Sequence, residues 1–371
     1  MTTGPPRSGG DRSSPSQGIV ETTKPDGTPD PGLTRSALGG VAWNWSGTVV
    51  LIVAQIASTA ATARLIAPDE FGAYAVGQAA AAFIGYFSLA AVGPGVQRHR
   101  LAGRALVGTA TTLTIVGAAF AAVVLYVGAP AWSSAWSVPE AKDAIRVFAL
   151  AVAFNTLSAV PIALLRRDLR FGRAALIETS SLVLGLGAGV ALATSLHSAV
   201  ALALGQAIGG TCLLLLSLWA VRGQLAISAD AAALRELLKF ASQIGALGFL
   251  TYLTITMPSW FVARLLGPSV LGLYSRASML VALPADYAAV AVTKVLFPIY
   301  GRLRGDLKRT SALLMESLTL SSGLVWPFFA LIAGAAPLIV DVLLGSRWEE
   351  VKDLLPLFAL AACGYTSSWL L

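Results

Sequence analysis

Ionisable side chains inside apolar segments are the residues most able to do chemistry in this chain, because a charge in hydrocarbon is costly. Asp286 and Lys294 lie eight positions apart in one such segment. At about 100° and about 1.5 Å per residue, the two share a helix face but are separated by about 12 Å along the axis, so direct pairing is not expected. Asp286 is either an ion- or proton-coupling group or a structural partner of a neighbouring helix. Lys294 either acts with it or extends its ammonium to the membrane surface.

Four arginines are candidate substrate-binding residues: Arg64, Arg264 and Arg276 lie in or beside apolar segments, and Arg35 precedes the first of them. A guanidinium group binds phosphate through paired hydrogen bonds. These positions therefore favour a phosphate-bearing substrate in an otherwise apolar cavity. The alternative is anchoring of the same side chains among lipid head groups.

Polar residues are frequent in two apolar segments, 38–63 and 237–262, which contain the further candidate substrate-binding residues Gln55 and Tyr252. A helix that faced only lipid would not carry so many polar groups. Their side chains face either a cavity or neighbouring helices, where polar groups also assist packing.

No catalytic centre is predicted from the sequence. The two histidines, His99 and His197, fall in expected loops, and the two cysteines, Cys212 and Cys363, fall inside apolar runs. No serine–histidine–aspartate set, metal-ligand spacing or phosphate-binding loop is present, so we expect neither enzymatic activity nor a cofactor or metal.

The composition indicates a membrane protein. Of 371 residues, 56% are hydrophobic and 12% are charged, whereas soluble domains carry roughly 25% charged residues. The formal net charge of +7 does not indicate nucleic-acid binding, because the basic residues form short clusters between apolar runs.

Ten apolar runs are long enough to cross a bilayer, which requires roughly 20 residues in a helix. They are 38–63, 71–93, 105–128, 143–165, 174–195, 198–221, 237–262, 273–296, 311–334 and 354–371. Residues 1–34 are rich in Gly, Pro, Ser and Thr and are expected to form a disordered tail. The tenth run is still apolar at Leu371, so we expect the natural protein to continue.

The basic residues predict the orientation, because short cytoplasmic loops are enriched in Lys and Arg. If the N-terminus is cytoplasmic, the inside segments hold 18 of the 26 basic residues, and each inside loop exceeds its outside neighbours. The alternation supports both the direction and the span count.

An internal repeat relates the ends of the first and seventh runs. Residues 63–74 read ARLIAPDEFGAY and residues 263–274 read ARLLGPSVLGLY, with six of twelve positions identical and no gap. Six runs separate the two copies, and an even number preserves orientation. The halves are therefore expected to be parallel repeats with a cavity between them. Two similar helix-to-helix turns are the alternative, but they do not explain the matching Arg and Tyr.

The motif ARLIAPDEFGAYAVGQ after the first run resembles the oligosaccharide flippases of polysaccharide and lipopolysaccharide biosynthesis. Its echo ARLLGPSVLGLYSRA, together with FPIYGRLRGD and PLIVDVLLGSRW, is also similar to that family, over roughly 36–371. The wider superfamily includes multidrug extruders and lipid II flippases.

The resemblance implies an all-α polytopic membrane protein with two parallel-repeat helical lobes. The expected organisation is a cytoplasmic tail over 1–34, an N-lobe of six spans over 35–222, a cytoplasmic loop over 223–236 and an incomplete C-lobe over 237–371. It also implies that the chain moves a polyprenyl-diphosphate-linked oligosaccharide from the inner to the outer leaflet of a bacterial plasma membrane by alternating access. Lipid-linked oligosaccharide, membrane lipids and polysaccharide polymerase or export proteins are the implied partners.

Two other readings remain open. A drug or small-cation exporter of the same superfamily would need cavity acids more than bases. A membrane glycan polymerase or ligase would need a large outer loop, whereas the longest expected outer segments, 129–142 and 335–353, are short and lack histidine. A scaffold that does not transport belongs to this last class of alternatives.

If Asp286 is the coupling group, the substitution Asp286→Asn is expected to reduce lipid-linked oligosaccharide flipping without loss of folded protein, because the amide cannot exchange a proton or hold a cation as the carboxylate does. Transport measured in membranes with equal protein amounts checks this. Unchanged transport would remove Asp286 from the mechanism.

Overall fold

The computed structural model describes residues 49–87, 92–98, 103–302 and 307–367. The expected tail over 1–34 and the candidate Arg35 lie outside the described residues, as does the side chain of Lys294.

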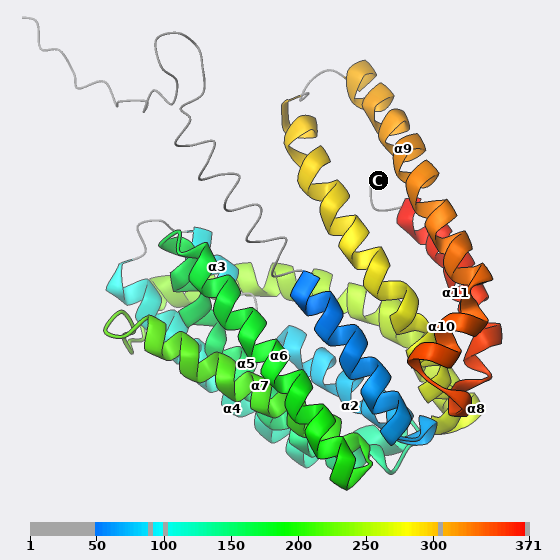
Figure 1. Ribbon diagram of the computed structural model, residues 1–371. Helices are drawn as coiled ribbons and strands as arrows, with labels where there is room; N and C mark the ends of the chain where they lie inside the picture. The colour runs from blue at the N-terminus through cyan, green and yellow to red at the C-terminus, as the bar shows by residue number, and fades with distance from the viewer. Residues whose placement is uncertain (1–48, 88–91, 99–102, 303–306, 368–371) are drawn as a thin grey trace, which may run out of the picture. The chain divides into compact units, whose positions relative to one another are not determined.

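The described residues form helices and contain no strand. A helix suits a membrane because it satisfies the polar N–H and C=O groups of its backbone internally. The described parts of all ten expected runs are helical, which confirms the all-α fold class. The helices are Val49–Leu65, α2 (Pro68–Phe87), α3 (Val92–Arg98), α4 (Arg104–Ala135), α5 (Ala141–Arg167), α6 (Phe171–Leu196), α7 (Ala199–Ala220), α8 (Ala231–Arg302), α9 (Leu307–Gly334), α10 (Ala336–Leu343), the short 3₁₀ helix η1 (Ser346–Trp348) and α11 (Val351–Ser367) (Figure 1).

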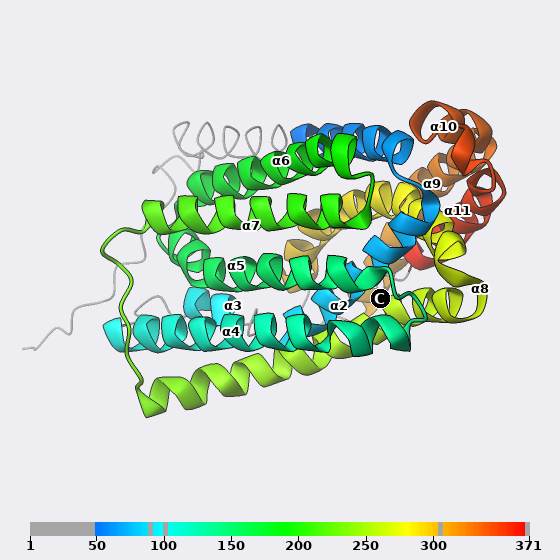
Figure 2. The same cartoon turned by 90° about the horizontal axis from the view of Figure 1, so that it is seen from below.

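Several of these helices are long and apolar enough to cross a membrane. Five pass by length and composition, namely α4, α5, α6, α7 and the part of α8 over Ala231–Asp286. A sixth candidate is the bent pair formed by the end of α9 and α10, whose axes differ by 68°. The chain is therefore a multi-pass membrane protein. Helices α6, α7, α5 and α4 pack side by side in that order (Figure 2).

Helix α8 consists of two helices that meet at Gly267, so it contains both the seventh and the eighth expected spans. Gly267 has φ 87° and ψ 177°, a conformation that is accessible to glycine and strained for other residues. The two parts, 231–266 and 268–302, are called α8a and α8b below.

The two copies of the repeat cross each other by a reciprocal contact between α2 and α8b. A Cβ atom added to Gly72 would lie 2.0 Å from the carbonyl oxygen of Pro268, and one added to Gly272 would lie 1.8 Å from that of Pro68. The glycine of each copy thus packs on the proline of the other, at equivalent positions. This exchange is what a pseudo-two-fold relation between the copies produces.

The residues just before each crossing also contact the opposite half of the chain. The indole Nε1 of Trp348 donates a hydrogen bond to the carbonyl oxygen of Ala63 at 2.9 Å, and the Trp348 side chain is fully buried. In the other direction, Nε1 of Trp260 in α8a donates to the carbonyl oxygen of Ala135 at 3.2 Å. The end of the first helix therefore packs on the second half, and α8a packs on the first.

A second repeat relates the starts of α5 and α11. Residues 141–150 read AKDAIRVFAL and residues 351–360 read VKDLLPLFAL, with five of ten positions identical. Each segment begins a helix and follows a buried tryptophan, Trp136 or Trp348. The sequence contained this signal, which extends the parallel repeat beyond its first motif.

The segment between the halves, which includes Ser228 and Asp230, packs against the start of α4. The Ser228 hydroxyl donates a hydrogen bond to the carbonyl oxygen of Ala105 at 3.1 Å. The carbonyl oxygen of Ser228 accepts a hydrogen bond from the Thr112 hydroxyl at 2.8 Å. Asp230 then caps α8a, since its Oδ1 accepts from the backbone N–H of Ala233 at 2.8 Å. The loop that was expected over 223–236 thus ends at Asp230, because this cap starts the helix at Ala231.

The substitution Gly72→Ala is expected to destabilise the fold by about 1–3 kcal/mol, because its Cβ would overlap backbone atoms that cannot rotate away. Gly272→Ala should cost a similar amount, since the contact is reciprocal. Thermal unfolding in detergent is the measurement.

Gly187→Ala in α6 is the matched control for this test. An added Cβ at Gly187 meets nothing within 4 Å, so this change should be neutral or stabilising by roughly 0.5–1 kcal/mol. Equal unfolding midpoints for Gly72→Ala and Gly187→Ala would contradict the crossing.

Candidate functional site

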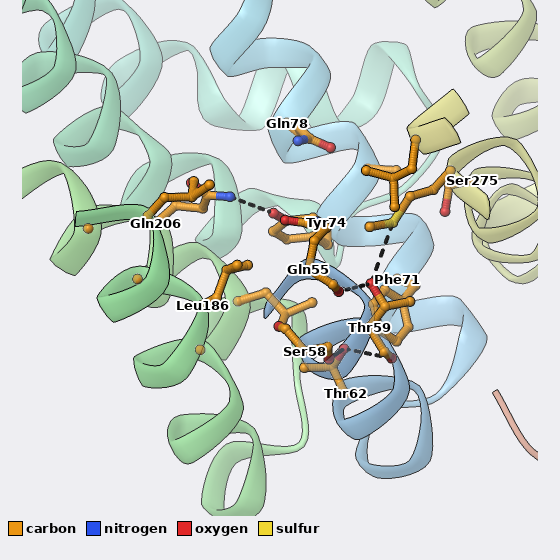
Figure 3. Close-up of a pocket in the computed structure, with 18 of the residues that line it drawn as sticks. Gln55, Ser58, Thr59, Thr62, Phe71, Tyr74, Gln78, Leu186, Gln206 and Ser275 are labelled. Carbon is orange, nitrogen blue, oxygen red and sulfur yellow. Dashed lines mark hydrogen bonds between the residues drawn. The ribbon is translucent and has the colours of Figure 1, made fainter. Parts of the chain in front are cut away.

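A cavity of about 390 Å³ opens between the two halves of the chain. Its walls come from the helix Val49–Leu65, α2, α5, α6 and α7 of the first half, and from α8b of the second (Figure 3). The crossing of α2 and α8b brings these walls together. A cavity between repeats is where membrane transporters commonly place their substrate sites.

Uncharged polar side chains line much of this cavity. The hydroxyl groups of Thr59 and Thr62 donate to the carbonyl oxygens one turn earlier, those of Gln55 and Ser58, both at 2.7 Å. Such bonds satisfy the hydroxyl proton within the helix, and the oxygen lone pairs remain able to accept from a substrate. Other polar lining residues are Gln78, Asn155, Ser181, Gln206 and Ser275.

Arg276 is the buried cation of the cavity wall. The residue is 8% exposed, and its guanidinium lies 4.1 Å from the centroid of the Phe71 ring. Its Nε atom is buried without a hydrogen-bond partner, and no carboxylate in the described parts of the chain pairs with it. A buried charge without a counter-ion is costly unless a bound group supplies the missing interactions. The arrangement is therefore suited to an anion.

The position of Arg276 breaks the symmetry of the repeat. With the offset of 200 residues, its counterpart in the first copy is Val76, which is fully buried in an apolar cluster. The scaffold at this position thus accepts an apolar side chain. Packing alone does not require an arginine here, and comparison of the two copies could have singled out Arg276 from the sequence.

Two carboxylates also line the cavity. Glu178 pairs with Arg166 at 2.6 Å rather than with Arg170 or Arg173, the partners suggested by proximity in the sequence. Arg166 lies in the last turn of α5 and Glu178 near the start of α6, so the short turn between the helices brings them together. Asp286 lies ten residues beyond Arg276 on α8b, about 15 Å along the axis, so the two do not pair directly.

Three of the predicted site residues share this cavity, and three lie elsewhere. Gln55, Arg276 and Asp286 line it. Tyr252 is buried in an aromatic cluster, with ring centroids 5.4 Å from Phe83 and 6.2 Å from Tyr86.

Arg64 and Arg264 stand at equivalent positions beside the crossing, outside the cavity lining. An Nη atom of Arg64 donates to the carbonyl oxygen of Val342 at 2.9 Å, and one of Arg264 donates to Oγ of Ser137. Each arginine thus donates a hydrogen bond to the opposite half of the chain.

Sequence reasoning did not select Phe71, Tyr74 or Gln206, although all three line the cavity. Nε2 of Gln206 in α7 donates to the Tyr74 hydroxyl in α2 at 3.2 Å (Figure 3). From the sequence alone, an aromatic residue in an apolar helix is indistinguishable from a core residue. The signal available was the place of Tyr74 in the repeat motif.

Comparisons with known proteins agree with this architecture. A family described as "Polysaccharide biosynthesis protein" matches residues 61–353. The chain is 28% identical over 302 residues to the succinoglycan biosynthesis transport protein ExoT of Rhizobium meliloti (strain 1021), covering 81% of this chain and 60% of that protein. It is 20% identical to the lipopolysaccharide biosynthesis protein WzxC of Escherichia coli (strain K12), covering 88% and 66%. The chain therefore spans less than two thirds of the length of these relatives.

Solved structures are similar in fold. An inward-facing multidrug resistance MATE family transporter of the MOP superfamily matches with a TM-score of 0.63 and 16% identity, over 89% of this chain and 83% of that one. A MATE structure in a bent conformation matches with a TM-score of 0.53 and 17% identity, over 87% and 79%. At such identities the likeness concerns the fold alone. Together the comparisons confirm the family resemblance that the motifs indicated.

The substitution Arg276→Met is expected to raise the thermal unfolding midpoint. It removes a buried donor without a partner, which costs about 1–3 kcal/mol or more for a charged group, and forfeits a cation–π contact of roughly 0.5–2 kcal/mol. Thermal unfolding in detergent, without added lipid, measures the balance.

Arg166→Met is the control for that measurement. Arg166 pairs with Glu178 in a half-exposed position, so its removal should lower stability by less than about 1 kcal/mol. A larger loss for Arg276→Met than for Arg166→Met would show that Arg276 is a structural cation.

Proposed function

Because this chain belongs to the polysaccharide biosynthesis protein family, we propose that it moves a polyprenyl-diphosphate-linked oligosaccharide from the inner to the outer leaflet of the plasma membrane. The N-terminus lies on the cytoplasmic side in this proposal, as the distribution of basic residues favours. The halves rock about their crossing and expose the cavity to each side in turn.

The observation that carries the proposal is the buried Arg276, which pairs with no carboxylate of the described residues, in the wall of a cavity lined by both polar and apolar side chains. A diphosphate would accept hydrogen bonds from the guanidinium and provide the missing counter-charge. The amide and hydroxyl groups around it suit the hydroxyl groups of a sugar. The polyprenyl chain stays in the surrounding lipid, where its apolar surface is not exposed to water.

The other predicted site residues take separate roles in this proposal. Gln55 contributes to the polar wall near the substrate. Asp286 and Lys294 on α8b are the candidate coupling groups, and Asp286 is an exposed carboxylate at the cavity. Arg64 and Arg264 act through the crossing rather than by contact with the substrate, and Tyr252 supports the packing of α8a.

A small-cation exporter is the second candidate function, because Glu178 and Asp286 place two carboxylates at the cavity. Cations are attracted by such groups, and the matched solved structures include multidrug transporters. Arg276 opposes this reading, since an unpaired buried cation repels a cationic substrate. Glu178 is moreover neutralised by Arg166.

A strain that lacks the gene tests the two functions. Lipid-linked oligosaccharide should accumulate on the cytoplasmic leaflet and be cleared by the wild-type gene. Arg276→Gln should restore clearance at least about tenfold less well, because a charge-assisted hydrogen bond contributes about 1.5–3 kcal/mol. Leaflet-specific extraction and quantification of the lipid is the measurement.

Asn155→Ala is a useful comparison, because it alters one uncharged lining residue and should reduce clearance far less. Equal clearance by wild type and Arg276→Gln would contradict a diphosphate site at Arg276. If no lipid accumulates and export of small organic cations fails, the exporter is the correct function.

A further inference from the structure

We infer that the Tyr74 hydroxyl is a second donor of the anion site, so that a diphosphate is held between Arg276 of the second half and Tyr74 of the first. This inference rests on the proposed function, because it names a further binding residue for the same substrate.

The hydrogen bonding of Tyr74 leaves its proton available. The residue is 9% exposed, and its ring packs on Phe148 with centroids 5.5 Å apart. Its oxygen accepts from Nε2 of Gln206 at 3.2 Å. In the described part of the chain the hydroxyl donates to no protein acceptor. A phenol that accepts from an amide is a stronger donor towards the cavity, because linked hydrogen bonds polarise one another.

Arg276 shares this cavity with Tyr74. Both residues line the cavity, one from α2 and one from α8b. Phe71, one turn before Tyr74, carries the guanidinium on its ring face. The crossing of α2 and α8b thus places a neutral donor and a cation in the walls of one cavity.

Comparison of Tyr74 with its counterpart in the second copy of the repeat distinguishes a binding role from a structural role. Its counterpart in the second copy is Tyr274, whose ring packs on Phe358 at 5.0 Å between centroids. Tyr274 does not line the cavity. The tyrosine is therefore part of both copies, but among the described residues only the tyrosine of the first copy lines the cavity and has an amide partner, Gln206.

A neutral donor suits this position. A diphosphate carries more negative charge than one guanidinium neutralises, and its oxygens still need donors in a site with little water. A second buried cation would be costly to desolvate. A phenol adds a donor with a far smaller desolvation cost.

Binding of farnesyl diphosphate and of farnesol to the purified protein in detergent tests this inference. Tyr74→Phe should weaken farnesyl diphosphate binding about tenfold or more and leave farnesol binding unchanged. Tyr274→Phe, the matched control, should change neither. In an Arg276→Gln background, Tyr74→Phe should cause a smaller further loss, because both donors bind one ligand group.

A purely structural role would lower binding of both probes or lower the unfolding midpoint instead. Should Tyr74→Phe fail to fold, 3-fluorotyrosine at position 74 keeps the ring and the hydroxyl and makes the phenol a stronger donor. It should tighten farnesyl diphosphate binding and leave farnesol binding unchanged. Equal binding by wild type and the fluorinated protein would overturn the inference.

The outcomes distinguish this inference from the proposed function. Wild-type protein that binds no farnesyl diphosphate would overturn both. Wild-type protein that binds it with an affinity unaffected by Tyr74→Phe would overturn the role of Tyr74 alone, and the diphosphate site at Arg276 would stand.

Discussion

The reciprocal packing of Gly72 on Pro268 and of Gly272 on Pro68 is the contact on which the rest of the structure depends. Only a glycine allows another backbone to approach so closely. Because each copy of the repeat supplies one glycine and one proline, the two halves are fixed to each other at one point. The helices that diverge from this point form the cavity walls, and Arg64 and Arg264 tie each half to the other beside it.

Comparison of the two copies of the repeat points to the proposed binding residue, because Arg276 is a position at which the copies differ. A symmetric scaffold predicts an apolar residue at 276, as at 76, whereas the arginine found there is buried and pairs with no carboxylate of the residues that the structure describes. Native proteins retain a costly group of this kind mainly where a ligand uses it. The polar side chains of the cavity, its position between the halves and the buried guanidinium of Arg276 together favour a substrate with an anionic group attached to a sugar.

The sequence was sufficient for the helices and for the pairing of the halves, because hydropathy and the identities between 63–74 and 263–274 are local signals. It was insufficient for the choice among arginines. Arg64, Arg264 and Arg276 all follow or lie in apolar runs, and only packing shows that two of them bind a carbonyl and a hydroxyl of the opposite half. Tyr74 was missed because an aromatic residue in an apolar run is typical of the core. Its hydrogen bond to Gln206 joins residues 132 positions apart, so the sequence gives no local sign of it.

The most direct test of a diphosphate lipid bound at Arg276 is native mass spectrometry of the protein purified from its own membranes in mild detergent. The account predicts a co-purified polyprenyl-diphosphate oligosaccharide on the wild-type protein and on Tyr274→Phe, and its loss from Arg276→Gln. Equal amounts of that lipid on all three proteins, or only ordinary phospholipid on each, would contradict it.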